Sequence, residues 1–223
     1  MKINQAETIL FIGDSITDCG RAYPVGIEAG LGDGYVSFIN SLLTAWYPER
    51  CLKVLNTGIS GNRIIDLEAR WQQDVLNLAP DWLSVMIGIN DVWRQFDSQF
   101  DTNQVSLELY EKTYRKLLEQ TRPALKGLVL MTPYFLESNL SDPMRKLMDM
   151  YSKAVERIAG EFDAVFVNVQ AAFDSFLKHK PTQSLCWDRV HPNKTGHLII
   201  ATSFLTAIGF DWTLAAKVAG SST

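Results

Sequence analysis

The stretch at residues 8–18, TILFIGDSITD, joins a short apolar run directly to a glycine, an acid and a serine. The run is rich in isoleucine and phenylalanine and gives way at once to small and polar residues, as a buried parallel strand does where it leaves the core. In open α/β sheets, ligands bind beyond the carboxyl ends of such strands. The stretch therefore predicts a parallel sheet and the edge of that sheet on which a site is expected.

The same pattern recurs along the chain, with segments of helical periodicity between the apolar runs. Five strands that alternate with helices predict one α/β domain over residues 1–223, with a five-stranded parallel sheet covered on both faces. The expected strands are 8–13 (TILFIG), 53–59 (KVLNTGI), 82–89 (WLSVMIGI), 127–134 (GLVLMTPY) and 164–169 (AVFVNV). The expected helices, with apolar residues three and four apart, are 35–46, 64–78, 106–120, 143–160 and 193–208. Asp142 is the expected N-cap of the helix that begins at residue 143.

Amino-acid composition and net charge indicate which class of partner or substrate the protein binds. The 223 residues are 47% hydrophobic and 21% charged, which is enough for one domain with a substantial core. The formal net charge is -4, and no cluster of lysine or arginine supplies the electrostatic footprint that nucleic acid requires. These features predict a small neutral substrate and no nucleic-acid partner.

The sequence also indicates the cellular compartment in which the protein is expected. No segment approaches the ~20 apolar residues of a membrane span, and residues 1–15 carry one lysine and a very short apolar run, so we expect neither a membrane partner nor a secretory signal. Cys19, Cys51 and Cys186 form no C-x-x-C pair and leave an odd cysteine, which favours a reducing compartment. The expected location is the cytoplasm.

Four polar clusters are expected to converge at one edge of the sheet. The first strand ends in GDS at 13–15, the second in NTGISGN at 56–62 and the third in GIND at 88–91, and a late segment reads WDRVHP at 187–192. The carboxyl ends of parallel strands lie on the same edge, so these clusters can meet there. This convergence is the main sign of a site.

A serine at the end of a strand is more often a cap or turn residue than a nucleophile, because a nucleophilic hydroxyl needs a base within hydrogen-bond reach. Three histidines could supply that base. His179 lies in a charged stretch and is expected in solvent, whereas His197 lies inside the last helical pattern and is expected to pack there. His191 is therefore the predicted partner of Ser15.

Asp188 precedes His191 by three residues, so its carboxylate can bond the ring nitrogen that faces away from the substrate. Such a bond fixes the tautomer and stabilises the imidazolium. The alternative interpretation is a loop in which Asp188 and Asn193 both cap the final helix. We expect Asn193 to be the cap, which leaves Asp188 and His191 free for catalysis.

Acyl transfer also needs hydrogen-bond donors aimed at the developing oxyanion. Asn90 offers a side-chain amide, Gly61 an unobstructed backbone N–H, and Ser15 its own N–H. Singly, Gly61 is typical of a turn and Asn90 of an Asx turn at a strand end. Beside a serine and a histidine, they favour an oxyanion hole.

Four of these residues occur in a fixed order: Ser15 in GDS, Gly61 in NTGISGN, Asn90 in GIND and His191 in DRVH. This order, together with the D-x-x-H spacing of Asp188, resembles the SGNH hydrolases, also called the GDSL family, from residue 13 to residue 191. Ile16 stands where the family label has leucine, a common apolar variation. The resemblance implies a three-layer α/β/α, flavodoxin-like fold and ester hydrolysis through an acyl-serine intermediate, with no metal or cofactor.

Six further stretches resemble the intracellular acetylxylan esterases of this family: FIGDSITDCGR at 11–21, DLEARWQQDV at 66–75, MIGINDVWRQ at 86–95, LMTPY at 130–134, DPMRK at 142–146 and CWDRVHP at 186–192. Those enzymes remove acetyl groups from xylo-oligosaccharides. The resemblance implies a small acetylated saccharide as substrate and, since family members of this type can oligomerise, a homo-oligomer.

Several residues near the predicted site are expected to contact substrate or to shape the pocket. Trp187, Trp93, Tyr134 and Phe135 are candidates for the aromatic walls of a saccharide site, and core or rim packing fits each of them at least as well. Trp187 is the favoured candidate, followed by Trp93. Asp14 is a further candidate for substrate binding, although a hydrogen bond to the backbone of the turn is the more favoured role. The residues expected at the pocket mouth are Asp18, Arg63 and Arg94, and those expected to serve packing alone are Cys19 and Cys186.

Three other functions use the same residues. A lipase, lysophospholipase or short-chain acyl esterase would share the serine, histidine and aspartate, but no long apolar lid or membrane-binding segment is evident. A metal-dependent phosphoesterase would use carboxylates and a histidine as ligands. A sugar-binding module would keep the pocket without catalysis. The ligand set of the metal-dependent alternative is Asp14, Asp91, Asp188 and His191.

Overall fold

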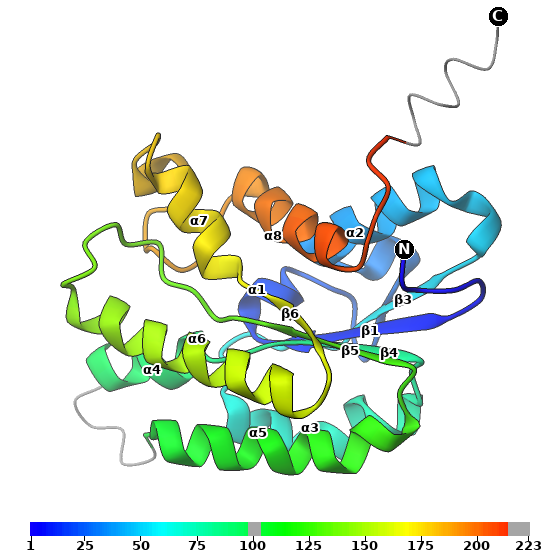
Figure 1. The fold of residues 1–223 in the computed structure, drawn as a ribbon, viewed down its shortest axis with the longest axis horizontal. Helices are drawn as coiled ribbons and strands as arrows, with labels where there is room; N and C mark the ends of the chain where they lie inside the picture. The colour runs from blue at the N-terminus through cyan, green and yellow to red at the C-terminus, as the bar shows by residue number, and fades with distance from the viewer. Residues whose placement is uncertain (98–103, 214–223) are drawn as a thin grey trace, which may run out of the picture.

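The computed structural model describes residues 1–97 and 104–213, which form a central sheet between two layers of helices (Figure 1). The strand order is β2-β3-β1-β4-β5-β6. The parallel strands are β1 (Thr8–Gly13), β3 (Lys53–Asn56), β4 (Trp82–Met86), β5 (Gly127–Met131) and β6 (Val165–Val167). The predicted α/β class and the five parallel strands are confirmed.

The predicted strand count is wrong by one. A sixth strand, β2 (Gly26–Ile27), pairs antiparallel with β3 at the edge of the sheet, with Gly26 opposite Asn56 and Ile27 opposite Leu55. Two residues are too few to produce an alternating hydrophobic pattern, so this strand had no signal in the sequence.

The first predicted strand ends at Gly13 as expected, whereas the other four predicted strands end two or three residues too late. After Met86 the apolar run continues, but Gly88 has a φ of 131° and turns the chain into helix α4 (Ile89–Asp97). A Cβ at Gly88 would lie 2.9 Å from the side chain of Pro133. This sharp turn carries Asn90 and Asp91 to the carboxyl edge of the sheet.

Helices cover both faces of the sheet. One layer holds α2 (Tyr35–Trp46), α7 (Val169–Leu177) and α8 (Lys194–Ala207), and the other holds α3 (Ile64–Asp74), α4, α5 (Leu107–Thr121) and α6 (Pro143–Glu161) (Figure 1). The single-turn helix α1 spans Ser15–Asp18. The 3₁₀ turns are Glu28–Gly30, Pro48–Arg50, Leu76–Leu78, Arg122–Ala124 and Thr182–Ser184.

The five predicted helices are confirmed, and most of their ends agree with the structure to within one or two residues. The exception is the segment expected at 64–78, where the α-helix stops at Asp74 and a 3₁₀ turn follows. Helices α1, α4 and α7 were not predicted, because each is short and begins no more than three residues after the end of a strand. Both predicted N-caps are confirmed: Asp142 accepts a hydrogen bond from the N–H of Arg145, and Asn193 accepts from Thr195 and Gly196.

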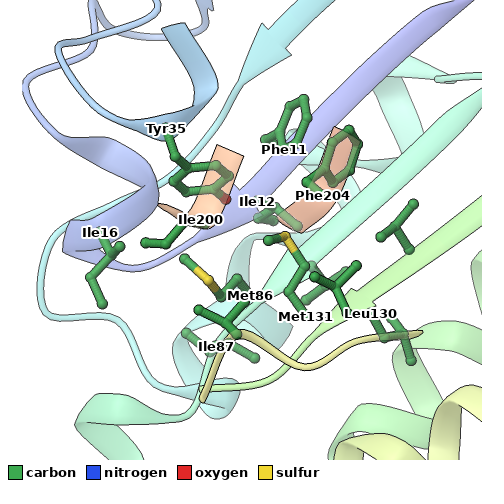
Figure 2. Close-up of a cluster of buried hydrophobic side chains, with 14 of the residues drawn as sticks. Phe11, Ile12, Ile16, Tyr35, Met86, Ile87, Leu130, Met131, Ile200 and Phe204 are labelled. Carbon is green, nitrogen blue, oxygen red and sulfur yellow. The ribbon is translucent and has the colours of Figure 1, made fainter. Parts of the chain in front are cut away.

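The core fixes the end of β1, from which the site begins. Phe11 packs edge-on against Tyr35 of α2, with ring centroids 5.8 Å apart, and against Phe204 of α8 at 5.0 Å (Figure 2). Ile12 and Met86 are also fully buried in this cluster. Each such side chain contributes roughly 2 kcal/mol through burial, so the strand ends are held rigidly.

No helix within the described residues is both long enough and apolar enough to cross a bilayer.

Candidate active site

Ser15 lies at the point where β1 ends and α1 begins. Asp14 has extended backbone angles and caps α1, since its Oδ1 accepts a hydrogen bond from the N–H of Ile16 at 3.0 Å. The close approach of the chains requires Gly13, because a Cβ there would lie 2.3 Å from the carbonyl oxygen of Met86. Ser15 is thus placed by backbone geometry that the core holds fixed.

Asp14 itself is buried beneath the nucleophile and does not line the pocket. The predicted hydrogen bond to the turn backbone is confirmed. We therefore leave Asp14 out of the substrate contacts proposed below.

A continuous chain of hydrogen bonds links Ser15 to His191 and Asp188. Ser15 Oγ lies 2.8 Å from His191 Nε2, and His191 Nδ1 lies 2.6 Å from Asp188 Oδ2. Because a carboxylate only accepts hydrogen bonds, Nδ1 carries the proton and Nε2 is left as the acceptor that faces the serine. The ring is in the tautomer that a general base for Ser15 requires.

Asp188 is held ionised. Burial acts to raise the pKa of its carboxyl, but hydrogen bonds from the His191 ring and from the N–H groups of His191 and Val190 outweigh it, so the pKa lies below its usual value. The negative charge is therefore present at neutral pH to stabilise an imidazolium on His191.

The two partners of Ser15 stand on an exposed loop. The side chains of His191 and Asp188 are 47% and 40% exposed, and residues 186–192 form no helix or strand. Arg189 in this loop has a φ of 64°, a left-handed conformation that is strained for a side chain of this size. The local sequence alone does not hold this loop in place.

The segment at residues 134–137, here called the splint, binds the catalytic loop, which is the loop at residues 186–192 that carries Asp188 and His191. Tyr134 Oη donates a hydrogen bond to the carbonyl oxygen of Val190 at 3.0 Å, and Leu136 N donates to that of Arg189 at 2.9 Å. Arg189 Nη1 forms an ion pair with Glu137 Oε2 at 2.8 Å. The loop is therefore bound at the two residues that separate Asp188 from His191.

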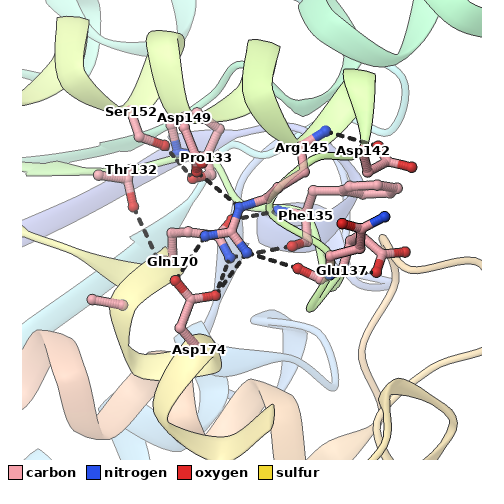
Figure 3. A network of polar contacts seen from close by, with 12 residues as sticks. Thr132, Pro133, Phe135, Glu137, Asp142, Arg145, Asp149, Ser152, Gln170 and Asp174 are labelled. Atoms are coloured by element: carbon pink, nitrogen blue, oxygen red, sulfur yellow. Dashed lines mark hydrogen bonds and ion pairs between the residues drawn. The ribbon is translucent and has the colours of Figure 1, made fainter. Parts of the chain in front are cut away.

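The splint is anchored in turn by a buried polar network (Figure 3). Arg145 of α6, with a side chain only 4% exposed, donates to the Glu137 carbonyl at 2.7 Å and binds the carboxylate of Asp174 through both Nη atoms, at 2.8 and 2.7 Å. Gln170 of α7 accepts from the N–H of Phe135 at 2.7 Å. Sequence reasoning missed these supporting residues.

The predicted oxyanion donors lie on the same wall of the pocket as Ser15. Residues 59–62 form a turn closed by a 3.2 Å bond from Asn62 N to the Ile59 carbonyl, and Gly61 occupies its third position with a φ of 82°. This is the backbone conformation for which a turn selects glycine. Asn90, at the start of α4, donates from Nδ2 to the Asn62 carbonyl at 3.1 Å.

Two buried carboxyls lie near the strand ends. Burial raises the pKa of both Asp14 and Asp91 to about 7, against the opposing effect of hydrogen bonds from the N–H groups of Ile16 and Ile64. Across residues 1–97 and 104–213, no three His, Cys, Asp or Glu side chains come together as a possible metal site. The metal-dependent alternative thus has no ligand cluster in this part of the chain.

The pocket has a volume of about 490 Å³ and opens to solvent. Trp93 lies on its wall, with its ring centroid 6.1 Å from that of His191. Trp187 is 89% exposed and lies on a neighbouring hollow of about 330 Å³ that shares His191 with the pocket. The lining residues are Ser15, Ile16, Cys19, Ser60, Gly61, Asn90, Trp93, Arg94, His191, Pro192 and His197.

The other candidates divide between core and pocket. Tyr134 and Phe135 are buried, so they form no aromatic wall for a sugar. Of the three residues expected at the pocket mouth, Arg94 lines the pocket, Arg63 donates to Asp66 at the start of α3, and Asp18 is buried under the turn that contains Gly61.

Cys19 and His197 meet at the pocket wall but do not form a second nucleophile and base. The N–H of Tyr35 donates to His197 Nδ1 at 3.2 Å, so the neutral ring carries its proton on Nε2, which faces Cys19 Sγ at 3.5 Å. Burial lowers the pKa of His197 to about 4 and raises that of Cys19. His197 therefore cannot accept the thiol proton. His179 is exposed, as predicted.

Comparison with known proteins places this geometry in context. Residues 11–199 match the model of the GDSL-like Lipase/Acylhydrolase family. An acetylxylan esterase of Geobacillus stearothermophilus is 53% identical over 215 residues, which cover 95% of this chain and 98% of that protein. The crystal structure of Axe2, an acetylxylan esterase from the same organism, superposes with a TM-score of 0.94 at 52% identity, covering 95% of this chain and 98% of that one.

A second solved structure is similar to the same extent. LAE5, an alpha/beta hydrolase enzyme from the metagenome of Lake Arreo, Spain, superposes with a TM-score of 0.92 at 47% identity and covers 94% of this chain and 98% of its own. Both similarities span nearly the whole length of each protein.

Proposed function

The chain belongs to the GDSL-like lipase/acylhydrolase family and is a carboxylic ester hydrolase, and from this premise we propose that it removes acetyl groups from acetylated xylo-oligosaccharides through an acyl-serine intermediate. The observation that carries the proposal is the hydrogen-bonded chain from Ser15 through His191 to Asp188. The similarity to an acetylxylan esterase over 95% of the chain supports the choice of substrate.

In the first step, Ser15 Oγ attacks the carbonyl carbon of the acetyl ester. His191 Nε2, 2.8 Å away, accepts the hydroxyl proton as the new bond forms. The ionised carboxylate of Asp188 stabilises the resulting imidazolium and keeps the ring in its orientation. No proton needs to move onto Asp188.

The negative charge that develops on the ester oxygen requires fixed donors. We assign this role to the N–H groups of Ser15 and Gly61 and to the side-chain amide of Asn90, which all line the pocket. Removal of one such donor costs about 3 kcal/mol of barrier where it has been measured. The tetrahedral intermediate collapses when His191 returns the proton to the departing sugar hydroxyl.

In the second step, water replaces the sugar. His191 takes a proton from water, the oxygen attacks the acetyl-serine, and acetate leaves as Ser15 regains its proton. The side chains of Asp188 and His191, the catalytic dyad, are exposed, so water has direct access to His191. The cycle consumes one water and one ester and yields acetate, one proton and a free sugar hydroxyl.

The proposed saccharide contacts are the two tryptophans beside the dyad. Trp93 lies on the pocket wall and Trp187 on the adjoining hollow, so a sugar chain that crosses His191 would meet an aromatic face on either side. Tryptophan suits this role because its ring packs on the apolar face of a pyranose.

We further propose a single catalytic domain that acts in the cytoplasm as a homo-oligomer. The free thiols of Cys19, Cys51 and Cys186 support a reducing compartment. Size-exclusion chromatography with light scattering would measure the oligomeric state directly.

Acetate release from acetylated xylo-oligosaccharides, compared with hydrolysis of a long-chain p-nitrophenyl ester, tests the proposal. Ser15→Ala is the blank in both assays, and a chelator is added to a parallel sample. Serine-dependent acetate release that resists the chelator supports the acetylesterase. Preference for the long-chain ester would instead indicate a lipase, and release that survives Ser15→Ala would overturn the mechanism.

A further inference from the structure

We propose that Asp18 is a positioning residue for the oxyanion hole, because its carboxylate ties the helix that carries Ser15 to the turn that presents Gly61. The inference rests on the proposed function, in which Gly61 is an oxyanion donor. Asp18 is the last residue of α1, and Ser15 is the first. It is 5% exposed and does not line the pocket, so it acts through the turn and not on substrate.

The contacts of Asp18 converge on Ser60, the residue before Gly61. Asp18 Oδ2 accepts a hydrogen bond from the backbone N–H of Ser60 at 3.0 Å and from its hydroxyl at 2.8 Å. The same oxygen accepts from the hydroxyl of Tyr23 at 3.0 Å. Charge-assisted bonds of this kind are stronger than neutral ones, and two of them hold one residue of the turn.

The turn needs such a restraint because packing supplies none at its apex. A Cβ built on Gly61 would meet no other atom of the described residues within 4 Å. The bond that closes the turn joins Asn62 to Ile59 and leaves the N–H of Ser60 outside it. The orientation of the peptide between Ser60 and Gly61, whose N–H is the proposed donor, is therefore set by polar contacts on either side.

The two sides of the turn have different anchors. On one side, Asn62 accepts from Arg70 Nε at 2.7 Å through its side chain and from Asn90 Nδ2 at 3.1 Å through its carbonyl. On the other side, Ser60 is bound by Asp18. Asp18 is the anchor that belongs to the nucleophile's own helix. Together with the bond from Ile59 N to the Gly13 carbonyl at 3.1 Å, it sets the spacing between Ser15 and Gly61.

This arrangement predicts whether each variant changes kcat or KM. Asp18→Ala frees Ser60 and displaces the Gly61 N–H, which interacts with charge that exists only in the transition state. Since loss of a whole donor costs about 100- to 1000-fold, partial displacement should lower kcat about 10- to 100-fold with KM within about threefold. Asp18→Asn keeps an acceptor oxygen in place and should retain at least about a third of the activity.

A second variant removes one of these bonds from the other partner. Ser60→Ala deletes the hydroxyl donor to Asp18 and keeps the backbone N–H bond, so it weakens the contact without placing new atoms against the carboxylate. It should lower kcat by about three- to tenfold, which is less than the effect of Asp18→Ala, and the double variant should lose no more than Asp18→Ala alone. Tyr23→Phe is the matched control, because it removes a bond from the same oxygen without touching the turn.

The experiment measures kcat and KM on p-nitrophenyl acetate and the inhibition constant of phenylboronic acid, which forms a tetrahedral adduct with the serine, for each variant and for Ser15→Ala. The expected result is a loss of boronate affinity that parallels the loss of kcat in Asp18→Ala and, to a smaller extent, in Ser60→Ala, with Asp18→Asn and Tyr23→Phe near wild type. Folding is verified by circular dichroism and thermal melting.

Folded Asp18→Ala or Ser60→Ala protein with wild-type kcat and boronate affinity would overturn the inference while an inactive Ser15→Ala leaves the proposed function intact. If Asp18→Ala does not fold, Ser60→Ala alone decides. Activity that survives Ser15→Ala would instead overturn the proposed function itself.

Discussion

The two halves of the catalytic centre are built differently. The half that holds Ser15, Gly61 and Asn90 lies at the ends of β1, β3 and β4, where buried strands and short turns fix the backbone. The half that holds Asp188 and His191 lies on an exposed loop without regular structure. The first half is positioned by the sheet, and the second by side chains from α6, α7 and the splint at residues 134–137.

This difference has a consequence for mutation. In the sheet half, the strand end holds the backbone of Ser15 in place, so removal of its hydroxyl reports on chemistry. The turn that carries Gly61 is the part of this half that also depends on side-chain contacts, from Asp18 and Asn90. In the loop half, a residue remote from the substrate can lower activity by releasing the loop. The predictions below test that contrast, from the largest expected effect to the smallest.

Replacement of the base should have the largest effect. His191→Ala removes the group that accepts the Ser15 proton, and we expect kcat to fall roughly 10⁴- to 10⁶-fold, as for a triad member elsewhere. Because the side chain is about half exposed, thermal stability should change little. Steady-state assays on p-nitrophenyl acetate and a thermal melt measure both. A folded variant with more than about a hundredth of wild-type activity would remove His191 from the proposed mechanism.

Replacement of an oxyanion donor should come next. Asn90→Ala deletes the side-chain amide, and kcat should fall about 100- to 1000-fold with a small change in KM. Asn90 is the second residue of α4, which begins at a turn that Gly88 sets, so the helix should persist. Circular dichroism provides the control. A loss that falls on KM alone would mean that Asn90 binds substrate and does not stabilise the oxyanion.

Release of the catalytic loop should lower kcat by a smaller factor. The residue replaced in this test does not touch substrate. Tyr134→Phe removes only the bond to the Val190 carbonyl, and we expect kcat to fall about tenfold, the equivalent of one hydrogen bond of about 1.4 kcal/mol. Tyr114→Phe is the matched control, since the buried Tyr114 hydroxyl has no partner among the described residues. Equal activity of the two variants would show that the splint does not position the dyad.

The two halves should also differ in the sign of their pH dependence. Burial raises the pKa of Asp91 to about 7, so this carboxyl favours the folded state at low pH, and that contribution is lost as pH rises from about 4 through about 7. Asp188 has a lowered pKa, so its contribution is present above the ordinary carboxyl pKa and is lost as pH falls through the folded value.

Thermal melts across pH test these signs. Relative to wild type, Asp91→Asn should gain about a few degrees in Tm as pH rises from 5 to 7. Above pH 7 the difference in Tm between the two proteins should stay constant. Asp188→Asn should be less stable than wild type at neutral pH and approach it in acid. A stability difference for Asp91→Asn that does not change with pH would mean that Asp91 is ionised throughout this range.

The sequence was sufficient for the sheet half because its signals are local. An apolar run that stops at GDS places Ser15 at a strand end, and Gly61 and Asn90 follow other strands in the same way. The spacing of Asp188 and His191 was also local, and their hydrogen bond is confirmed. Each of these assignments needed only a short stretch of chain.

The supporting residues could not be predicted, because their partners are distant in sequence. Tyr134 and Val190 are separated by 56 positions, and Arg145 and Asp174 by 29. Asp18 was expected at the pocket mouth, and only the folded structure shows it buried against Ser60, 42 positions away. Sequence patterns predict elements and their ends, whereas polar contacts between elements depend on how the layers pack.

The most direct test of the account is to trap its intermediate. Protein quenched with acid during turnover of acetylated xylo-oligosaccharide is digested and analysed by mass spectrometry. The account predicts the added mass of one acetyl group on the peptide that contains Ser15, absent from Ser15→Ala. Turnover with acetate release but no acetyl group on that peptide, together with activity that persists in Ser15→Ala, would contradict it.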